Sequence, residues 1–368
     1  MNHRRPILAA LLAALFAGPW VSGPVVPVAG AELPARLSDA DFWRIVDTFS
    51  EPDGFFRSDN LVSNEETFQF VIPTLASTVV PGGVYVGVGP DQNFTYIAAV
   101  RPRLAFIMDI RRGNLHLHLM YKALFEQSAD RAEFLSRLFS RARPDGLSRQ
   151  STPEALFEAF ELVRPDRERF DRNVADLTAW LTRKRAFPLS GADLSGVIDV
   201  YSRFYAAGPY LRYSNSSMRG RRYPSYQDLQ LTDDGRAVNR SYMASDAHFR
   251  FVKGLQERNL VIPIVGDFAG PKALRTVGAY LQQRGGIVTT YYTSNVEQYL
   301  FPDGAWPTFV ENLSALPLDD TSTLIRSCFN NCSSTYRSWS LLDSIPALIA
   351  DARAGRLRMY WDVLSRSR

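Results

Sequence analysis

Residues 82–114 read GGVYVGVGPDQNFTYIAAVRPRLAFIMDIRRGN, and this stretch decides the fold. Residues 84–88 and 104–108 are continuous apolar runs of strand length, typical of strands that are buried on both faces of a parallel sheet. Between them, the apolar spacing of residues 92–100 predicts a helix that Pro102 stops. Residues 114–128 predict a second helix. Strand, helix, strand, helix is the order of an α/β protein with a covered parallel sheet.

The same pattern returns near the end of the chain. We expect a helix over 245–257, a strand over 260–265, a helix over 271–284 and a strand over 287–292. Pro263 cannot donate a ladder hydrogen bond, so it predicts either the beginning of a strand or an edge strand. The fold class is therefore a Rossmann-like, doubly wound, mostly parallel sheet.

A long segment separates the two α/β parts. Residues 127–210 show helical periodicity almost throughout, and residues 211–240 are polar and turn-rich, with at most one short strand near 229–231. We read 127–244 as a helical insertion with a polar loop region. The first half of the sheet domain then occupies 32–126, opening with an amphipathic helix in 37–50 and a mixed segment that ends near Pro73. Residues 245–368 hold the second half and C-terminal helices.

The first 31 residues have the form of an export signal. Arg4 and Arg5 precede an apolar run over 7–17, and Ala29-Gly30-Ala31 has the small-x-small form of a signal-peptidase site, which predicts a mature chain that begins near Glu32. The apolar run is shorter than the roughly 20 residues that span a bilayer, which favours a cleaved signal over a permanent anchor. Arg4-Arg5-Pro6-Ile7-Leu8 also resembles part of a twin-arginine signal. We expect a periplasmic or secreted protein with no stable membrane span after cleavage.

Net charge and cysteine content limit which ligands and which compartment we expect for this protein. The mature chain would keep 40 basic and 38 acidic residues, a balance that does not indicate nucleic-acid binding. Cys328 and Cys332 predict a small disulfide loop in an oxidising compartment. A metal site is not expected, since the chain has only these two cysteines and four histidines, and His116 and His118 point to different sides of their helix.

The glycines at 87 and 89 are the first candidate site. A strand that runs into Gly87-Val88-Gly89 and then a helix lets a ligand approach the backbone and the amide groups that start at Gln92 and Asn93. Asp109 lies 22 residues after Gly87, at the end of the next strand, where an acid can accept hydrogen bonds from both ribose hydroxyls. With Arg111, these residues form the predicted nucleoside-binding site. A nicotinamide dinucleotide site would need a third glycine where Gln92 stands, which argues against a dehydrogenase.

Residues 82–126 and 245–300 resemble class I S-adenosylmethionine-dependent methyltransferases. GVGPDQNFTYIAAVRPRLAFIMDIRR, NLVIPIVGDFAGPKAL and YYTSNVEQYLF are similar to segments of an uncharacterised family of bacterial methyltransferase-like proteins. The resemblance implies S-adenosylmethionine as cofactor, with its methionine moiety above Gly87 and Gly89 and its ribose at Asp109. It implies a substrate or catalytic position for Asp267. Tyr85 and Val86 replace the acid that usually precedes the first glycine, and no Asn-Pro-Pro-Tyr element follows the later strand.

Each candidate also has a structural interpretation. The two glycines suit a tight strand-to-helix turn, and Asp109 suits a pair with Arg111 or Arg112. Asp267 suits a helix cap. Ser294, Asn295 and Glu297 follow a strand, where open α/β sheets place their sites, but they also suit a capping box. Arg219, Arg221 and Arg222 suit an anionic ligand or a solvated loop.

Two hypotheses for the function remain. The first is a methyltransferase-like enzyme that acts on a small molecule, with Asp267 and Asn295 as catalytic residues. The second is an exported, non-catalytic protein that binds a ligand or a partner on the same scaffold, which agrees with export because free S-adenosylmethionine is not expected outside the cytoplasm. A Ser-His-Asp hydrolase is not expected, since the chain has no Gly-x-Ser-x-Gly elbow and only His248 in its second half.

Overall fold

The computed structural model describes residues 32–213, 223–329 and 332–367. The predicted export signal in residues 1–31 and the arginines at 219, 221 and 222 lie outside the described residues. These described residues form one compact unit. None of the helices within the described ranges has the length and apolar character needed to cross a bilayer.

A six-stranded sheet is the centre of the fold. Its strands, in chain order, are β1 (Val84–Gly87), β2 (Leu104–Asp109), β3 (Val261–Val265), β4 (Val288–Ser294), β5 (Thr323–Phe329) and β6 (Ser338–Ser344). Their order across the sheet is β3-β2-β1-β4-β5-β6, and all neighbours are parallel except β5 and β6. This is the doubly wound order, in which the direction of winding reverses between β1 and β4. The fold is therefore Rossmann-like, as the sequence predicts.

The helices surround this sheet on both faces. The described α-helices are α1 (Asp39–Phe49), α2 (Ile72–Thr78), α3 (Gln92–Val100), α4 (Arg112–Gln127), α5 (Arg131–Phe139), α6 (Pro153–Glu161), α7 (Arg167–Ala179), α8 (Gly191–Ala207), α9 (Tyr226–Leu231), α10 (Asp246–Glu257), α11 (Ala273–Gln282), α12 (Glu297–Leu300), α13 (Trp306–Ser314), α14 (Ile345–Arg353) and α15 (Tyr360–Ser365). Short π and 3₁₀ helices span Trp180–Lys184 and Gly208–Tyr210.

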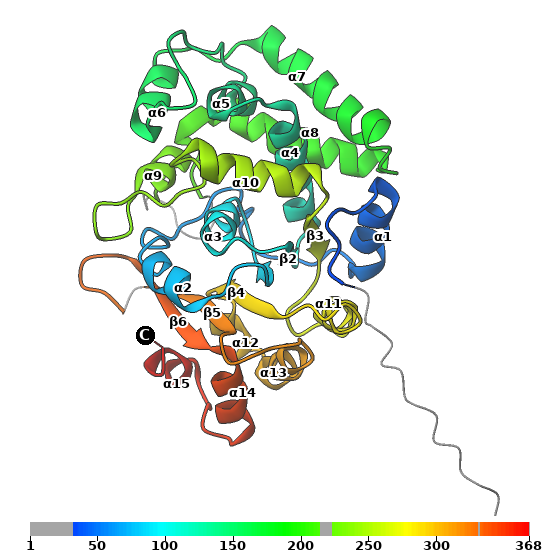
Figure 1. Cartoon of the computed structure of the whole chain (residues 1–368), viewed down its shortest axis with the longest axis vertical. Coiled ribbons are helices and arrows are strands. Elements are labelled where there is room, and N and C mark those ends of the chain that lie inside the picture. The colour runs from blue at the N-terminus through cyan, green and yellow to red at the C-terminus, as the bar shows by residue number, and fades with distance from the viewer. Residues whose placement is uncertain (1–31, 214–222, 330–331, 368) are drawn as a thin grey trace, which may run out of the picture. The chain divides into compact units, whose positions relative to one another are not determined.

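In Figure 1, α3, α4 and α10 lie on one side of the sheet, and α11 and α13 lie on the other. The first group contains the crossovers from β1 to β2 and from β2 to β3, and the second contains those from β3 to β4 and from β4 to β5. Burial of the sheet on both faces explains why β1, β2 and β3 are continuous apolar runs.

The long segment between the two α/β parts is helical in its described residues. Helices α5 to α9 fall in it, and its described parts, 127–213 and 223–244, contribute no strand to the sheet. Figure 1 shows α5 to α8 beyond α4 and α10, away from the strands. α4 packs against both β3 and α8, so it connects this helical layer to the sheet.

Pro263 lies in a strand at the edge of the sheet. It lies in β3, pairs with Ile107 and occupies an edge strand, so its missing N–H interrupts no second ladder. The prediction of an edge position is therefore confirmed.

The structure differs locally from the sequence-based expectations at two places, and it contains two strands that were not predicted. Residues 226–231 form helix α9 rather than a strand, because Ser225 and Asp228 make a capping box at its start. Pro73 does not end a segment but lies in the first turn of α2, where its missing N–H costs nothing. β5 and β6 lie in the C-terminal part, where no strand after residue 292 was predicted.

Candidate functional site

A cavity of about 410 Å³ opens at the carboxyl ends of the parallel strands, a volume within the range of small-molecule sites. Its wall includes Gly89 after β1, Asp109 at the end of β2, Asp267 after β3, and Asn295 after β4. Open α/β sheets bind their ligands at this edge, where the winding reverses. Four of the eight predicted site residues therefore line one cavity, although they come from four different strand ends.

The other four predicted residues support this cavity without lining it. They are Gly87, Gln92, Asn93 and Arg111. The hydroxyl of Tyr85 donates to Oδ1 of Asn93 at 2.8 Å, and Nδ2 of Asn93 donates to the carbonyl oxygens of Val88 at 2.8 Å and Pro90 at 2.7 Å. Asn93 thus fixes the glycine turn from inside the protein.

The two glycines have different roles in this turn. A side chain at Gly87 would collide with Tyr85 and Asn93, whereas Gly89 has a φ of +77° and a Cβ there would meet no protein atom within 4 Å. Gly87 therefore permits close packing, and Gly89 provides the left-handed backbone and an open approach from the cavity.

Two buried titratable groups lie behind the glycine turn. Nε2 of His118 lies 2.8 Å from the carbonyl oxygen of Gly89, and burial lowers the pKa of His118 to about 4, so the imidazole is neutral at pH 7 and donates this bond. Burial raises the pKa of Asp91 to about 7, and its carboxyl group accepts hydrogen bonds from Gln230 and Tyr242. His116 pairs instead with Asp193, so the two histidines do point to different sides.

Asp109 forms the pair with Arg111 that the structural interpretation of its sequence position expects, and it also lines the cavity. Its Oδ1 accepts the backbone N–H of Arg111 at 2.9 Å and lies 3.4 Å from Nε of the same residue. Asp109 is nevertheless one of the residues that line the cavity. Burial raises the pKa of Asp109. Since two carboxylate oxygens offer about four acceptor sites, Asp109 retains the capacity to accept hydrogen bonds from a ligand.

Asp267 and Asn295 lie at the ends of β3 and β4. Oδ1 of Asp267 accepts the N–H of Ala269 at 2.9 Å and so closes a turn, but α11 begins only at Ala273 and Asp267 is not its cap. Nδ2 of Asn295 lies 3.3 Å from Oε1 of Gln298. The alternative capping box at 294–297 is not formed, because Val296 is the N-cap of α12 and Glu297 pairs with Arg326.

Glu65 also lines the cavity, although no local sequence pattern predicts a site there. This side chain is 1% exposed. Its Oε1 accepts hydrogen bonds from the hydroxyls of Tyr292, at 2.8 Å, and Ser294. Its Oε2 accepts from Nε2 of Gln92 at 2.7 Å. Glu65 therefore connects the N-terminus of α3 to the end of β4 at the cavity wall.

Two further groups give the cavity wall unused hydrogen-bonding capacity. Oδ1 of Asn60 and Nη1 of Arg337 are buried and have no hydrogen-bond partner within the described part of the chain. Both residues line the cavity. Aromatic rings, including those of Phe268, Tyr292, Tyr299 and Phe329, provide apolar surface beside them. This mixture suits a ligand with one flat apolar part and several polar groups.

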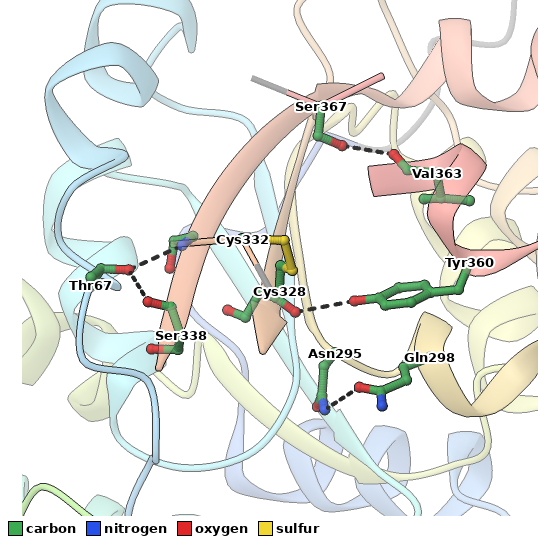
Figure 2. The surroundings of a disulfide bond; sticks show 11 residues. Thr67, Asn295, Gln298, Cys328, Cys332, Ser338, Tyr360, Val363 and Ser367 are labelled. Carbon is green, nitrogen blue, oxygen red and sulfur yellow. Dashed lines mark hydrogen bonds between the residues drawn. A yellow bond between two sulfur atoms is a disulfide. The ribbon is translucent and has the colours of Figure 1, made fainter. Parts of the chain in front are cut away.

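The predicted disulfide supports the cavity from its β5 side. Cys328 is bonded to Cys332, and Phe329, next in the chain, lines the cavity. Figure 2 shows the disulfide between Thr67 and Ser338 on one side and Tyr360 on the other. Oγ1 of Thr67 donates to the carbonyl oxygen of Ser338 at 3.1 Å and thereby holds the start of β6.

Within the described ranges, no group of three or more His, Cys, Asp or Glu side chains is arranged to hold a metal ion.

A buried ion-pair network fixes the same region. Arg326, in β5, is fully buried and binds Glu297 at 2.6 Å and Asp343 at 2.8 Å. Arg326 also donates to the carbonyl oxygen of Val363 at 3.2 Å, which ties α15 to the sheet. The strand ends that form the cavity wall are therefore held by polar contacts between distant segments.

Fold and site together define a doubly wound α/β protein with a ligand-sized cavity at its topological switch point. The family model described as a domain of unknown function, DUF7790, matches residues 60–186 and 210–344. The chain belongs to this family. The matched ranges contain every strand of the sheet and every predicted site residue. A search of curated proteins found no match.

Proposed function

We propose that this protein is methyltransferase-like and binds a nucleoside-containing ligand of the S-adenosylmethionine type in the cavity. The observation that carries this proposal is the joint position of Gly89 and Asp109 at the switch point. Gly89 leaves its backbone open to the cavity, and Asp109 has acceptor sites for ribose hydroxyls. The aromatic side chains of the wall suit an adenine ring. These residues fit the ligand on chemical grounds.

The other two predicted residues would act on the second substrate. Asp267 supplies a carboxylate that can accept a hydrogen bond or a proton from the acceptor group, and Asn295 supplies an amide that can orient it. S-adenosylmethionine, when bound, would supply an electrophilic methyl group. The substrate would then be a small molecule that fits the remaining part of the cavity.

A specific observation favours the second candidate, an exported binding protein without catalysis. Tyr85 stands where the methyltransferases that this sequence resembles carry an acid, and its hydroxyl is bonded to Asn93 rather than directed to the cavity. The disulfide is compatible with a periplasmic or extracellular location. Binding of an adenosyl ligand without methyl transfer would support this candidate over the enzyme.

Calorimetry on the chain from Glu32 onward tests the site, with S-adenosylmethionine, S-adenosylhomocysteine and adenosine as probes. We expect Asp109→Ala to weaken binding by about 1.5–3 kcal/mol, because it removes a charged hydrogen-bond acceptor. Asp171→Ala is the control, since Asp171 is exposed on α7 and does not line the cavity.

Gly89→Val should abolish binding because its side chain would enter the cavity. Gly285→Val is the matched control: Gly285 also has positive φ and free space around it, but it lies outside the cavity wall. The proposal is wrong if the folded wild type binds none of the probes, or if Asp109→Ala binds as tightly as wild type.

A further inference from the structure

Glu65 is a buried acid that forms no ion pair with a basic side chain of the described residues. No described Lys, Arg or His side chain forms an ion pair with it, although it is 1% exposed. Its surroundings are neutral donors, namely the Tyr292 and Ser294 hydroxyls and the Gln92 amide. Burial of a carboxylate is costly unless hydrogen bonds and an opposite charge compensate it. The described residues provide the hydrogen bonds, but none of their basic side chains provides the opposite charge.

Glu65 and Asp109, the other buried acid that lines the cavity, lie on opposite sides of the glycine turn. Glu65 is bonded to residues at the end of β4, whereas Asp109 ends β2. Strand β1 lies between β2 and β4. The two acids therefore flank the glycine turn that follows β1, one on each side, and a ligand lying across this turn would extend from Asp109 to Glu65.

The charges of the cavity wall favour a cation. Among the described residues, Glu65, Asp109, Asp267 and Asp303 line it, against Arg57 and Arg337, and Asp109 already lies beside Arg111. The guanidinium of Arg57 already donates to the hydroxyl of Tyr299 and lies over its ring. Glu65 accepts three hydrogen bonds from the protein, which leaves about one acceptor site for a ligand donor.

We infer that the cavity takes a ligand bearing a protonated amine, and that Glu65 is the residue that recognises it. This inference deepens the proposed function and rests on it for the location of the site. The amine has two possible sources: an aminoalkyl chain on the nucleoside ligand itself, or a separate small amine bound beside the nucleoside.

Three probes separate these sources. The first two are 5′-methylthioadenosine and S-adenosyl-3-thiopropylamine, which share the nucleoside and the thioether but differ in the aminoalkyl chain. The third is n-butylamine alone. In calorimetry near pH 7 we expect the wild type to bind S-adenosyl-3-thiopropylamine at least roughly 10-fold more tightly than methylthioadenosine, or to bind n-butylamine, because a charge-assisted hydrogen bond corresponds to a factor of this order.

Glu65→Gln keeps the shape of the side chain and removes its charge, so it should abolish the preference for the amine and leave methylthioadenosine binding within a few-fold. Glu66→Gln is the matched control, since Glu66 is the adjacent acid and does not line the cavity. Circular dichroism and the thermal midpoint check that both variants fold. If Glu65→Gln does not fold, Glu65→Asp replaces it, and the retracted carboxylate should reduce the same preference.

The outcomes separate the two proposals. A wild type that shows no preference for the amine and does not bind n-butylamine overturns the inference, as does a preference that Glu65→Gln leaves unchanged. If neither adenosyl probe binds while n-butylamine binds in a manner that depends on Glu65, the nucleoside proposal fails and the amine site stands.

Discussion

The hydroxyl of Tyr85 donates to Oδ1 of Asn93 at 2.8 Å, immediately beside the backbone of Gly87. A Cβ at Gly87 would lie 1.9 Å from this Oδ1 and 2.7 Å from the Tyr85 hydroxyl oxygen. Asn93 is fully buried and also bonded to the turn carbonyls, so it has no room to move aside. This polar contact therefore determines which residue can occupy position 87.

Gly87→Ala should destabilise the protein by about 1–3 kcal/mol, the usual cost of overpacking a filled core, measured by urea unfolding. Gly113→Ala is the control: Gly113 lies in the first turn of α4 with free space around it, and the substitution should be neutral or stabilise by up to about 1 kcal/mol. Equal stability of Gly87→Ala and wild type would contradict the packing described here.

The pKa of Asp91 makes stability depend on pH. Burial raises this pKa from the ordinary 3.8 to about 7, so between these pH values the folded state holds a proton that the unfolded state has released. The contribution of Asp91 to stability is therefore lost as pH rises through this window. Asn cannot ionise, so Asp91→Asn should gain roughly 3–4 kcal/mol relative to wild type between pH 4 and pH 8.

Unfolding of both proteins by urea at several pH values measures this gain. Comparison with wild type at each pH is needed because His118, with its lowered pKa, gives stability the opposite slope between about pH 4 and its ordinary 6.5. Thr95→Ser keeps a hydroxyl and removes no titrating group, so its stability difference should not change with pH. A constant difference for Asp91→Asn would show that this carboxyl group is not titrating in the window.

Arg326→Met should cost about 3–5 kcal/mol, because it leaves Glu297 buried without a cation, while Asp343 keeps its pair with Arg366. The control is Arg44→Met, which breaks an exposed pair with Asp41 and should cost no more than about 1 kcal/mol. Denaturant unfolding compares the two variants. A similar loss of unfolding free energy in both variants would mean that the buried Arg326 network contributes no more to stability than an exposed ion pair.

Reduction of the Cys328–Cys332 disulfide should lower stability by no more than about 2 kcal/mol, since so short a loop restricts few unfolded conformations. Alkylation followed by mass spectrometry of unreduced protein from an oxidising compartment should find no free thiol. Detection of two alkylated cysteines before reduction would contradict the bond.

The β1-α3-β2-α4 part of the fold could be predicted because each strand is a continuous apolar run and each helix has its own periodicity. β5 was missed because Arg326 interrupts its apolar pattern. The charge is tolerated only because Glu297 and Asp343 meet it in space, and no local pattern reveals such partners.

Local sequence patterns also determine which residues of the candidate site could be predicted. Gly89, Asp109, Asp267 and Asn295 each follow or end a strand, so strand prediction alone was enough to bring them to one edge of the sheet. Glu65 follows no strand, and its partners at 92, 292 and 294 are distant in sequence. Only the folded chain shows that its carboxylate belongs to the cavity.

The pairing of β1 with β4 has a kinetic consequence. Val84 and Thr289 are neighbours across these strands although they are 205 residues apart in sequence. The centre of the sheet cannot close until the helical segment and β4 have been synthesised, and contacts of such long range slow folding. During synthesis β1 and β2 therefore have two unpaired edges until β3 is made, and β1 keeps one until β4 is made, so an agent that binds unpaired strands has its longest opportunity in that interval.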